Sequence, residues 1–374
     1  RHTRLSRCRN TGIGGECLLF FTCDHKVSII PCAGSVPNTS LKGVALSLDA
    51  IIVADYEVSS LSGSHPLKLS IDGETADIQT VYDYITHDRI KPAAAESKRT
   101  PSWASAPKLN GIYLLSFLQG KNFEVALIDN FFLEKERFRC LIKENPRAVI
   151  ISTTFIHSKK VLRQLVEDIR TVAGDITVIV GGPFIYSSYL VWKRRNEPEY
   201  AFEEIKQDFV FQGQGEPAVD LYIISLKGEE VLSEALRLIH RGERIDDLPN
   251  TARLVGDSYR FSPRIDDLSD SKTFSIDWEA LPSSLFESGV MPMQASTGCT
   301  FRCAFCNFVK DIRLTSVISL DQLVADLRTV AKRRIRYVWF VDDNFRLGKK
   351  DLNEVSRRFI DEDLGIRWMS FMRA

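Results

Sequence analysis

The sequence predicts an α/β protein in which a doubly wound parallel sheet is followed by the first half of a partial (β/α) barrel. Two observations support this fold class. Short apolar, β-branched runs alternate with segments of helical periodicity, and many of these runs end in polar or glycine-rich turns. Buried parallel strands joined by crossover helices produce such an alternation. The pattern divides the chain into residues 1–44, 45–225, 226–289 and 290–374.

Length and composition indicate a globular chain. With 374 residues and a hydrophobic content of 44%, the chain can form two domains with substantial cores. Lysine and arginine together number 49, as do aspartate and glutamate, so no basic field favours a nucleic-acid partner. The chain has no run of about 18 apolar residues and no signal-peptide pattern. We therefore expect a cytoplasmic protein without a membrane partner.

The first 44 residues have little periodicity. They contain four cysteines, at Cys8, Cys17, Cys23 and Cys32. The intervals match no paired zinc-ligand pattern. We expect residues 1–44 to be disordered or an artefactual extension.

The first domain, 45–225, is built from buried strands that alternate with helices. The apolar runs predict strands at Ala50–Ala54, Phe123–Ile128, Ala148–Ile151, Ile176–Val180 and Asp208–Phe211. Helices are expected over 138–145 and 161–172, and over a segment that Asn110 caps and Gly120 ends. The apolar face of that segment should consist of Tyr113, Leu114, Phe117 and Leu118. The polar stretch 57–106 is predicted to be a long excursion or lid.

Three turns follow strands of this predicted sheet. They are Ser152-Thr153-Thr154, Gly181-Gly182-Pro183 and Gly213-Gln214-Gly215-Glu216. Ligands of open α/β sheets bind beyond the carboxyl ends of the strands, where these turns should meet. Glycine there lets the backbone approach a bulky ligand closely, although glycine also ends ordinary strands.

A connector is expected over 226–289, after a helix near 221–226 and with a second helix near 232–239. The last unit, 290–374, should alternate strand, helix, strand, helix and strand. Its strands are predicted at Met291–Ser296, Arg336–Val341 and Ile366–Met372. Ser319 and Gln322 form a capping box for the first helix, and 351–360 is expected to be the second.

Three cysteines provide the strongest functional signal. Cys299, Cys303 and Cys306 stand in the run STGCTFRCAFCN, with the spacing C-x-x-x-C-x-x-C. Three thiolates on a four-iron cluster leave one iron open to a small molecule. A structural zinc site or cysteines buried for packing are the alternatives. Zinc normally takes four ligands, and no second pair or nearby histidine follows Cys306.

With this order of features, the chain resembles the cobalamin-dependent radical S-adenosylmethionine (SAM) enzymes. Thr297-Gly298 and Phe305 complete the resemblance around the cysteines. The resemblance implies that 45–225 is a Rossmann-like cobalamin-binding domain and that 290–374 is an incomplete radical SAM core with its first three strands. Residues 48–186 are most similar to the phosphinate P-methyltransferase branch. Because later strands of such a core are missing, the chain is expected to be truncated.

The resemblance also implies roles for individual residues. It places a 4Fe-4S cluster on Cys299, Cys303 and Cys306, and SAM or cluster contacts on Phe305, Asp342 and Asp343. Cobalamin contacts are implied for Ser152, Thr153, Thr154, Gly181, Gly182, Gly213, Gly215 and Glu216. Because no D-x-H-x-x-G run occurs, His157 is expected to be an ordinary loop residue rather than a cobalt ligand.

The implied activity is reductive cleavage of SAM at the cluster, followed by methylation of an unactivated carbon or phosphorus centre. The expected partners are a small-molecule substrate and an electron donor such as flavodoxin or ferredoxin. Two alternatives stay open. One is a cyclase or rearrangement enzyme with the same cofactors, and the other is a non-catalytic cobalamin- or zinc-binding module. Neither the substrate nor the activity of the chain by itself follows from the sequence.

Overall fold

The computed structural model describes residues 48–56, 69–71, 74–76, 106–197, 209–211, 219–265, 275–301, 303, 316–345 and 349–372. Every described element belongs to one compact unit, Leu46–Ala374. Several predicted site residues lie outside the described ranges, namely Gly213, Gly215, Glu216, Phe305 and Cys306. The predicted division of this unit at 225 and 289 stays a prediction.

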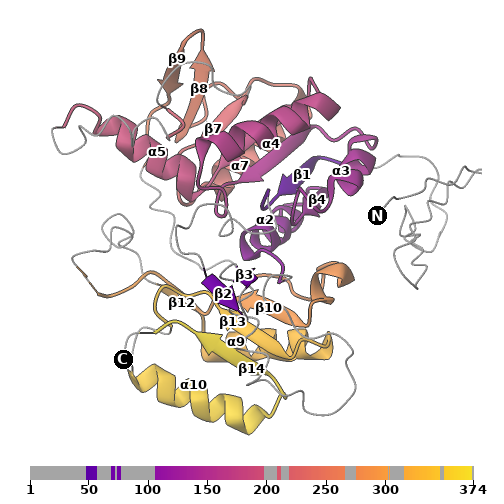
Figure 1. Ribbon diagram of the computed structural model, residues 1–374, viewed down its shortest axis with the longest axis vertical. Coiled ribbons are helices and arrows are strands. Elements are labelled where there is room, and N and C mark those ends of the chain that lie inside the picture. Colours follow the sequence, from indigo (N-terminus) through magenta and orange to yellow (C-terminus); the bar gives the residue numbers. More distant parts are fainter. Residues whose placement is uncertain are drawn as a thin grey trace, which may run out of the picture. The chain divides into compact units, whose positions relative to one another are not determined.

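A seven-stranded, mostly parallel sheet confirms the predicted α/β class (Figure 1). Its order is β4-β1-β5-β6-β7-β8-β9, in which the first five strands are parallel and the last two are antiparallel. The strands are β1 (Ala50–Val53), β4 (Val125–Ile128), β5 (Ala148–Ser152), β6 (Thr177–Gly181), β7 (Leu221–Ile223), β8 (Thr251–Val255) and β9 (Ser258–Phe261).

Helices cover both faces of this sheet because its central strands are buried on both sides. Alternate residues of β1 belong to two different apolar clusters: Ala50 and Ile52 to one, Ile51 and Val53 to the other. The first cluster includes residues of α2 and α7, and the second includes residues of α3, α4 and α5. These helices are α2 (Leu109–Gly120), α3 (Lys135–Ile142), α4 (Lys159–Val172), α5 (Pro183–Lys193) and α7 (Glu229–Arg241).

Close packing of α2 on the sheet depends on Gly111. A Cβ atom at this position would lie 2.6 Å from Ala54 Cβ and 2.7 Å from a methyl group of Leu127. Those distances are too short for any real side chain. Glycine therefore sets how closely α2 approaches β1 and β4.

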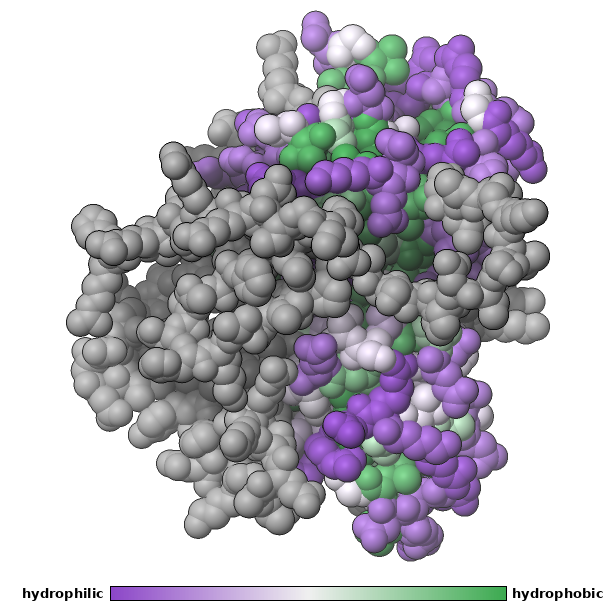
Figure 2. All heavy atoms as spheres, turned by 90° about the vertical axis from the view of Figure 1, so that its right-hand side faces the viewer, coloured by the Kyte–Doolittle hydropathy of each residue, from purple (hydrophilic) through white to green (hydrophobic). Residues whose placement is uncertain are grey.

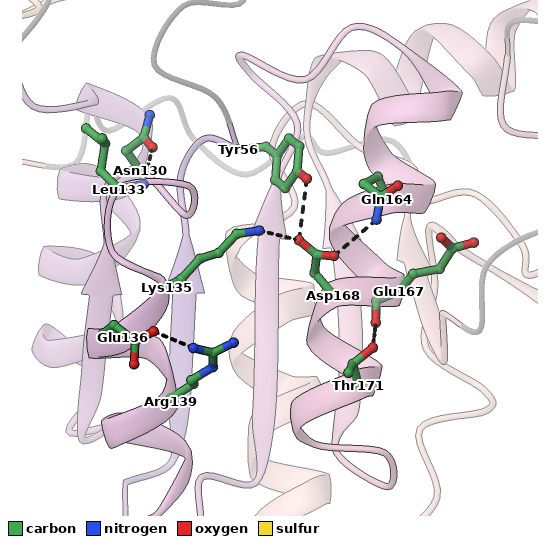
Figure 3. Close-up of polar contacts among 10 residues, drawn as sticks. All are labelled: Tyr56, Asn130, Leu133, Lys135, Glu136, Arg139, Gln164, Glu167, Asp168 and Thr171. Atoms are coloured by element: carbon green, nitrogen blue, oxygen red, sulfur yellow. Dashed lines mark hydrogen bonds and ion pairs between the residues drawn. The ribbon is translucent and has the colours of Figure 1, made fainter. Parts of the chain in front are cut away.

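A hydrogen-bonded group on the other face joins the end of β1 to α3 and α4 (Figure 3). Asp168 accepts from Lys135 Nζ at 2.9 Å, from Gln164 Nε2 at 3.1 Å and from the Tyr56 hydroxyl at 3.4 Å. Burial acts to raise the pKa of Asp168, but these donors outweigh it and lower the pKa. The group holds the chain where it leaves β1.

Two predictions for this sheet are wrong. Residues 209–211 form a bend and turn instead of a strand, and the strand beside β6 is β7, where a helix over 221–226 was predicted. The helix predicted near 232–239 is confirmed as α7, and the β8–β9 hairpin that follows it extends the sheet. A run of three apolar residues is too short for its periodicity to distinguish a strand from a helix. Pairing with β6 therefore decides that β7 is a strand.

The second sheet has the predicted alternation of strand, helix, strand, helix and strand. It has three parallel strands in the order β10-β13-β14. The elements are β10 (Val290–Met293), α9 (Leu320–Lys332), β13 (Tyr337–Phe340), α10 (Lys349–Glu362) and β14 (Arg367–Ser370). The predicted cap is confirmed, since Ser319 Oγ accepts the backbone N–H of Gln322 at 3.2 Å.

One apolar cluster continues from the first sheet to the second. The cluster that holds Ile112 and Leu115 of α2 also holds Met291 of β10 and Phe340 of β13. Asp277, in the segment between the sheets, donates its backbone N–H to Ser116 Oγ at 2.9 Å. Where Figure 2 colours the surface, hydrophilic residues surround smaller hydrophobic patches. The remaining described elements are the β2 (Leu69–Ile71) and β3 (Glu74–Ala76) hairpin, the 3₁₀ helix η3 (Ser283–Phe286) and a two-stranded pair described below.

Candidate functional site

A cavity of about 1290 Å³ lies where strands of both sheets end. From the first sheet it is lined by four of the predicted residues, Ser152, Thr154, Gly181 and Gly182. From the second sheet it is lined by three more that the sequence singled out, Thr297, Gly298 and Asp343. The structure thus brings together residues from the two predicted cofactor positions around one space.

We call the edge of the cavity that the first sheet provides the first rim. There the turns after β5 and β6 touch each other. The backbone N–H of Thr153 donates to Gly181 O at 2.8 Å, and Thr153 Oγ1 donates to the same oxygen at 2.9 Å. Gly182 has φ of 111°, and a Cβ atom there would lie 2.9 Å from the Thr153 nitrogen. Only glycine fits this position. Thr153 is fully buried and does not line the cavity, so the predicted triplet 152–154 is divided between the core and the cavity.

Asn110 is a cavity residue whose role the sequence prediction missed. It was expected to cap α2, but the N-cap is Lys108. Its Nδ2 instead donates to Ala54 O at 3.0 Å and to Ser152 Oγ at 2.8 Å. Its Oδ1 is buried and has no hydrogen-bond partner among the residues that the structure describes. An unsatisfied buried acceptor is unfavourable, so this atom would gain from a donor on a ligand.

A charged group stands beside Asn110 at the same rim. Lys108 Nζ lies 3.8 Å from Asp55 Oδ2 and 5.2 Å from the centre of the Phe155 ring. The backbone N–H of Lys108 donates to Asp129 Oδ1 at 2.6 Å. Burial raises the pKa of Asp129 to about 6, against the lowering effect of the hydrogen bond from Lys108. The sequence prediction missed this group, because Asp55 and Asp129 follow different strands and Lys108 precedes α2, so only the packing brings them together.

We call the edge of the cavity that the second sheet provides the second rim. It contains the acidic pair that follows β13. Asp342 is buried, and its carboxylate accepts the backbone N–H groups of Ala295 and Ser296 and the Ser296 hydroxyl. Burial raises its pKa, although these donors act in the other direction. Asp343 lines the cavity and accepts the Gly298 N–H at 2.9 Å. Its pKa is also raised, because the surrounding protein displaces water.

The cysteine loop begins and ends at a short antiparallel pair. β11 (Ser296–Thr297) pairs with β12 (Ser316–Val317), and Thr297 Oγ1 lies 2.7 Å from Ser316 Oγ. Gly298, with φ of 78°, turns the chain into the loop. Cys299 and Cys303 are half-buried. In the part of the chain that the structure describes, no three His, Cys, Asp or Glu side chains are grouped as metal ligands. Cys306 lies outside that part, so the triplet stays a prediction.

A third wall of the cavity was not predicted. α2 contributes Tyr113 and Phe117, α7 contributes Glu229, and the chain between the sheets contributes Trp278. Burial and a hydrogen bond with Glu229 raise the pKa of Tyr113. Asp326 of α9 completes the wall, and burial raises its pKa to about 6. Tyr113 had been expected to belong to the core face of α2, but it is only half-buried.

His157 lies on the loop before α4 and is exposed. It is not among the residues that line the cavity. Among the described residues, no helix is both long enough and apolar enough to span a bilayer.

Comparisons with known proteins give a distant likeness to methyltransferases. No family model matches the chain. It is 22% identical over 298 residues to an uncharacterized methyltransferase, PH0819, of Pyrococcus horikoshii, and the match covers 76% of this chain. The chain spans only 59% of that relative's length. This identity is too low to assign the chain to a family.

Two solved structures of the radical SAM methyltransferase TsrM from Kitasatospora setae are also similar. The first, with cobalamin and a 4Fe-4S cluster bound, has a TM-score of 0.49 at 14% identity and covers 86% of this chain and 55% of its own. The second, with tryptophan substrate and the SAM analogue aza-SAM bound, has a TM-score of 0.49 at 13% identity and covers 86% and 54%. Because both scores are below 0.5, the fold rests on the sheet order described above.

Proposed function

We propose that the chain belongs to an enzyme that binds a 4Fe-4S cluster, SAM and cobalamin and methylates an unactivated carbon or phosphorus centre of a small molecule. One observation carries the proposal: Ser152, Gly182 and Asp343 line the same cavity. Two cofactors that share one substrate must reach a common space. The cysteine triplet and the distant likeness to a methyltransferase support the same reading.

The first rim fits a large ligand that carries amide groups, as the corrin ring does. Asn110 offers the buried oxygen that has no partner among the described residues, and amide N–H groups are suitable donors to it. Ser152 and Thr154 add hydroxyl groups that line the cavity. Gly182 keeps the two turns closely packed and places no side chain at this edge of the cavity, so a broad ligand can approach the backbone.

The second rim fits a cluster and an amino-acid ligand. Cys299 and Cys303 stand on a loop that β11 and β12 close at its base. Asp343 presents a carboxylate to the cavity, and a carboxylate attracts an ammonium group such as that of SAM. When bound, the cluster and SAM would supply the radical that activates the substrate, and cobalamin would supply the methyl group.

The protein's own task in this proposal is alignment and exclusion of water. Apolar side chains of α2 and of the second sheet line the cavity, among them Leu114, Phe117, Met293 and Trp339. Reactants held at fixed positions in a dry site react faster than free reactants. The third wall of the cavity, with Tyr113 and Trp278, is where a substrate would contact the protein.

Anaerobic reconstitution tests the proposal. Protein supplied with iron, sulfide and cobalamin should retain all three after gel filtration, and with reductant and SAM it should form 5′-deoxyadenosine. The variant C299A/C303A/C306A should lose the iron and the brown absorbance. As the matched control, C140S changes an exposed cysteine of α3 outside the cavity and should retain both. Zinc in place of iron in the wild-type chain would contradict the proposal.

Product mass separates the two enzyme readings. A methyltransferase adds one methylene unit to its substrate, whereas a cyclase or rearrangement enzyme leaves the mass without that increment. Iron without bound cobalamin would mean that the first rim has another ligand.

A further inference from the structure

The two carboxylates after β13 differ in their contacts, although they are adjacent in the sequence. Asp342 is 3% exposed and does not line the cavity. Its oxygens accept Ala295 N–H at 3.1 Å and Ser296 Oγ–H at 2.5 Å, and they also accept Ser296 N–H. All three donors belong to Ala295 and Ser296, at the start of β11.

These bonds hold the chain at one point on its way to the cysteines. Ala295 is fixed from both sides, because its own carbonyl accepts the Ile318 N–H at 3.0 Å. β13 is fixed to β10 next to this point, since the Val341 N–H donates to Met293 O at 2.9 Å. Cys299 follows Ser296 by three residues. A shift of Ser296 would therefore move the first cysteine.

Asp343 faces the other way. It is exposed to the cavity and accepts a single hydrogen bond from the described residues, the one from Gly298 N–H at 2.9 Å. An ionised carboxylate has about four acceptor positions, so most of its capacity is open to a ligand. The adjacent backbone of Gly298 lines the same part of the cavity.

We infer that Asp342 is a positioning residue for the cysteine loop and does not contact SAM, which leaves Asp343 as the one member of the acidic pair for the ammonium contact that the family resemblance implies. This inference rests on the proposed function and changes one of its expectations, since both aspartates were expected to contact SAM. The physical reason is that Asp342 already uses its carboxylate on the backbone of the loop entrance. A buried carboxylate with these donors has no face left for a ligand.

Matched single variants separate the two roles. Asparagine keeps the shape of aspartate but replaces one acceptor oxygen with a donor group, which would face the N–H donors of Ala295 and Ser296. In anaerobically reconstituted protein, D342N should lose iron to a chelator about ten-fold or more faster than wild type, as removal of an outer partner of a metal ligand usually does. Its reduced cluster should also have an altered electron paramagnetic resonance spectrum.

D343N should show the opposite pattern. Its iron content, chelator resistance and spectrum without SAM should match wild type. The SAM concentration that changes the spectrum should rise by about ten-fold to a hundred-fold, the range for a hydrogen bond to a charged group.

Folding is controlled with a second variant and a spectroscopic check. S296A removes the Ser296 hydroxyl, which donates to Asp342 and more weakly to Asn344 O, and should accelerate iron loss in the same direction as D342N, but less. Far-ultraviolet circular dichroism should be unchanged in S296A. Equal iron loss in D342N and D343N, or a normal cluster in both D342N and S296A, would overturn the inference. Failure of the wild-type chain to assemble a four-iron cluster would instead overturn the proposed function.

Discussion

The two rims of the cavity are built by different means. At the first rim, backbone groups and small side chains meet directly: Thr153 donates twice to Gly181 O, and Gly182 leaves no room for a Cβ atom. At the second rim, carboxylates accept hydrogen bonds from backbone N–H groups, as Asp342 does from Ala295 and Ser296. Close approach without side chains suits a broad neutral ligand, whereas carboxylates that accept backbone N–H groups suit the cluster-binding loop proposed above.

This contrast makes the first rim sensitive to volume and the second sensitive to charge and hydrogen bonding. At the first rim, adding one methyl group at Gly182 should be the small change that disturbs the packing most. At the second rim the shape can be kept while function is lost, as expected for D342N and D343N.

The largest effect is expected for G182A. The backbone at Gly182 has φ of 111°, and the new Cβ atom would lie 2.9 Å from Thr153 N and Oγ1. We expect a loss of about 3 kcal/mol or more in the free energy of unfolding, from backbone strain and overpacking together. Urea denaturation monitored by circular dichroism measures it.

The neighbouring glycine is the matched control for that change. A Cβ atom at Gly181 would lie 3.4 Å from Ile223 Cβ, which is an ordinary contact. G181A should therefore change the free energy of unfolding by about 1 kcal/mol or less. Similar losses in both variants would remove the special role of Gly182.

An intermediate and pH-dependent effect is expected for D129N. Burial raises the pKa of Asp129 to about 6 in the folded state, so the folded protein binds this proton more tightly than the unfolded chain. The wild-type chain should therefore lose stability as pH rises from about 4 to about 6, while D129N lacks this loss. D129N should equal wild type at pH 4.5 and be about 2 kcal/mol more stable at pH 7.5.

Denaturation at both pH values checks this result, with D257N as the control. Asp257 is exposed at the turn between β8 and β9. D257N should show no such rise in relative stability between the two pH values. A D129N curve parallel to wild type at all pH values would contradict the effect of burial at Asp129.

The smallest effect is expected at the second sheet, for S319A. Ser319 Oγ accepts the Gln322 N–H at 3.2 Å and caps α9. Loss of such a cap lowers the free energy of unfolding by about 1 kcal/mol. Thermal denaturation should show a lower Tm for S319A than for S284A, which changes an exposed serine of η3. Equal Tm values would show that the cap contributes nothing here.

Periodicity alone predicted much of the fold. β1 and β13 are continuous apolar runs, and α4 repeats its buried residues Leu162, Leu165, Val166 and Ile169 at helical spacing. β7 was mistaken for a helix because three apolar residues fit either structure. Only its pairing with β6 on one side and β8 on the other makes it a strand.

Prediction of the candidate site was less complete. Gly182 was singled out because it follows a strand, and Asp343 because the family resemblance implies a SAM contact after a strand; both line the cavity. Asn110 was misread as a helix cap, since a polar residue in a first turn usually is one. Trp278 and Tyr113 had no local signal for a role in the cavity, because that role depends on which segments pack beside α2.

The α/β class and the spacing of Cys299, Cys303 and Cys306 could be predicted without the structure, because both depend on residues that are close together along the chain. Long-range packing decided that strands of both sheets end around one cavity. It also decided that adjacent Asp342 and Asp343 point to different surroundings, one into the core and one into the cavity. Successive residues at a strand end face opposite sides, and what lies on each side is supplied by distant parts of the chain.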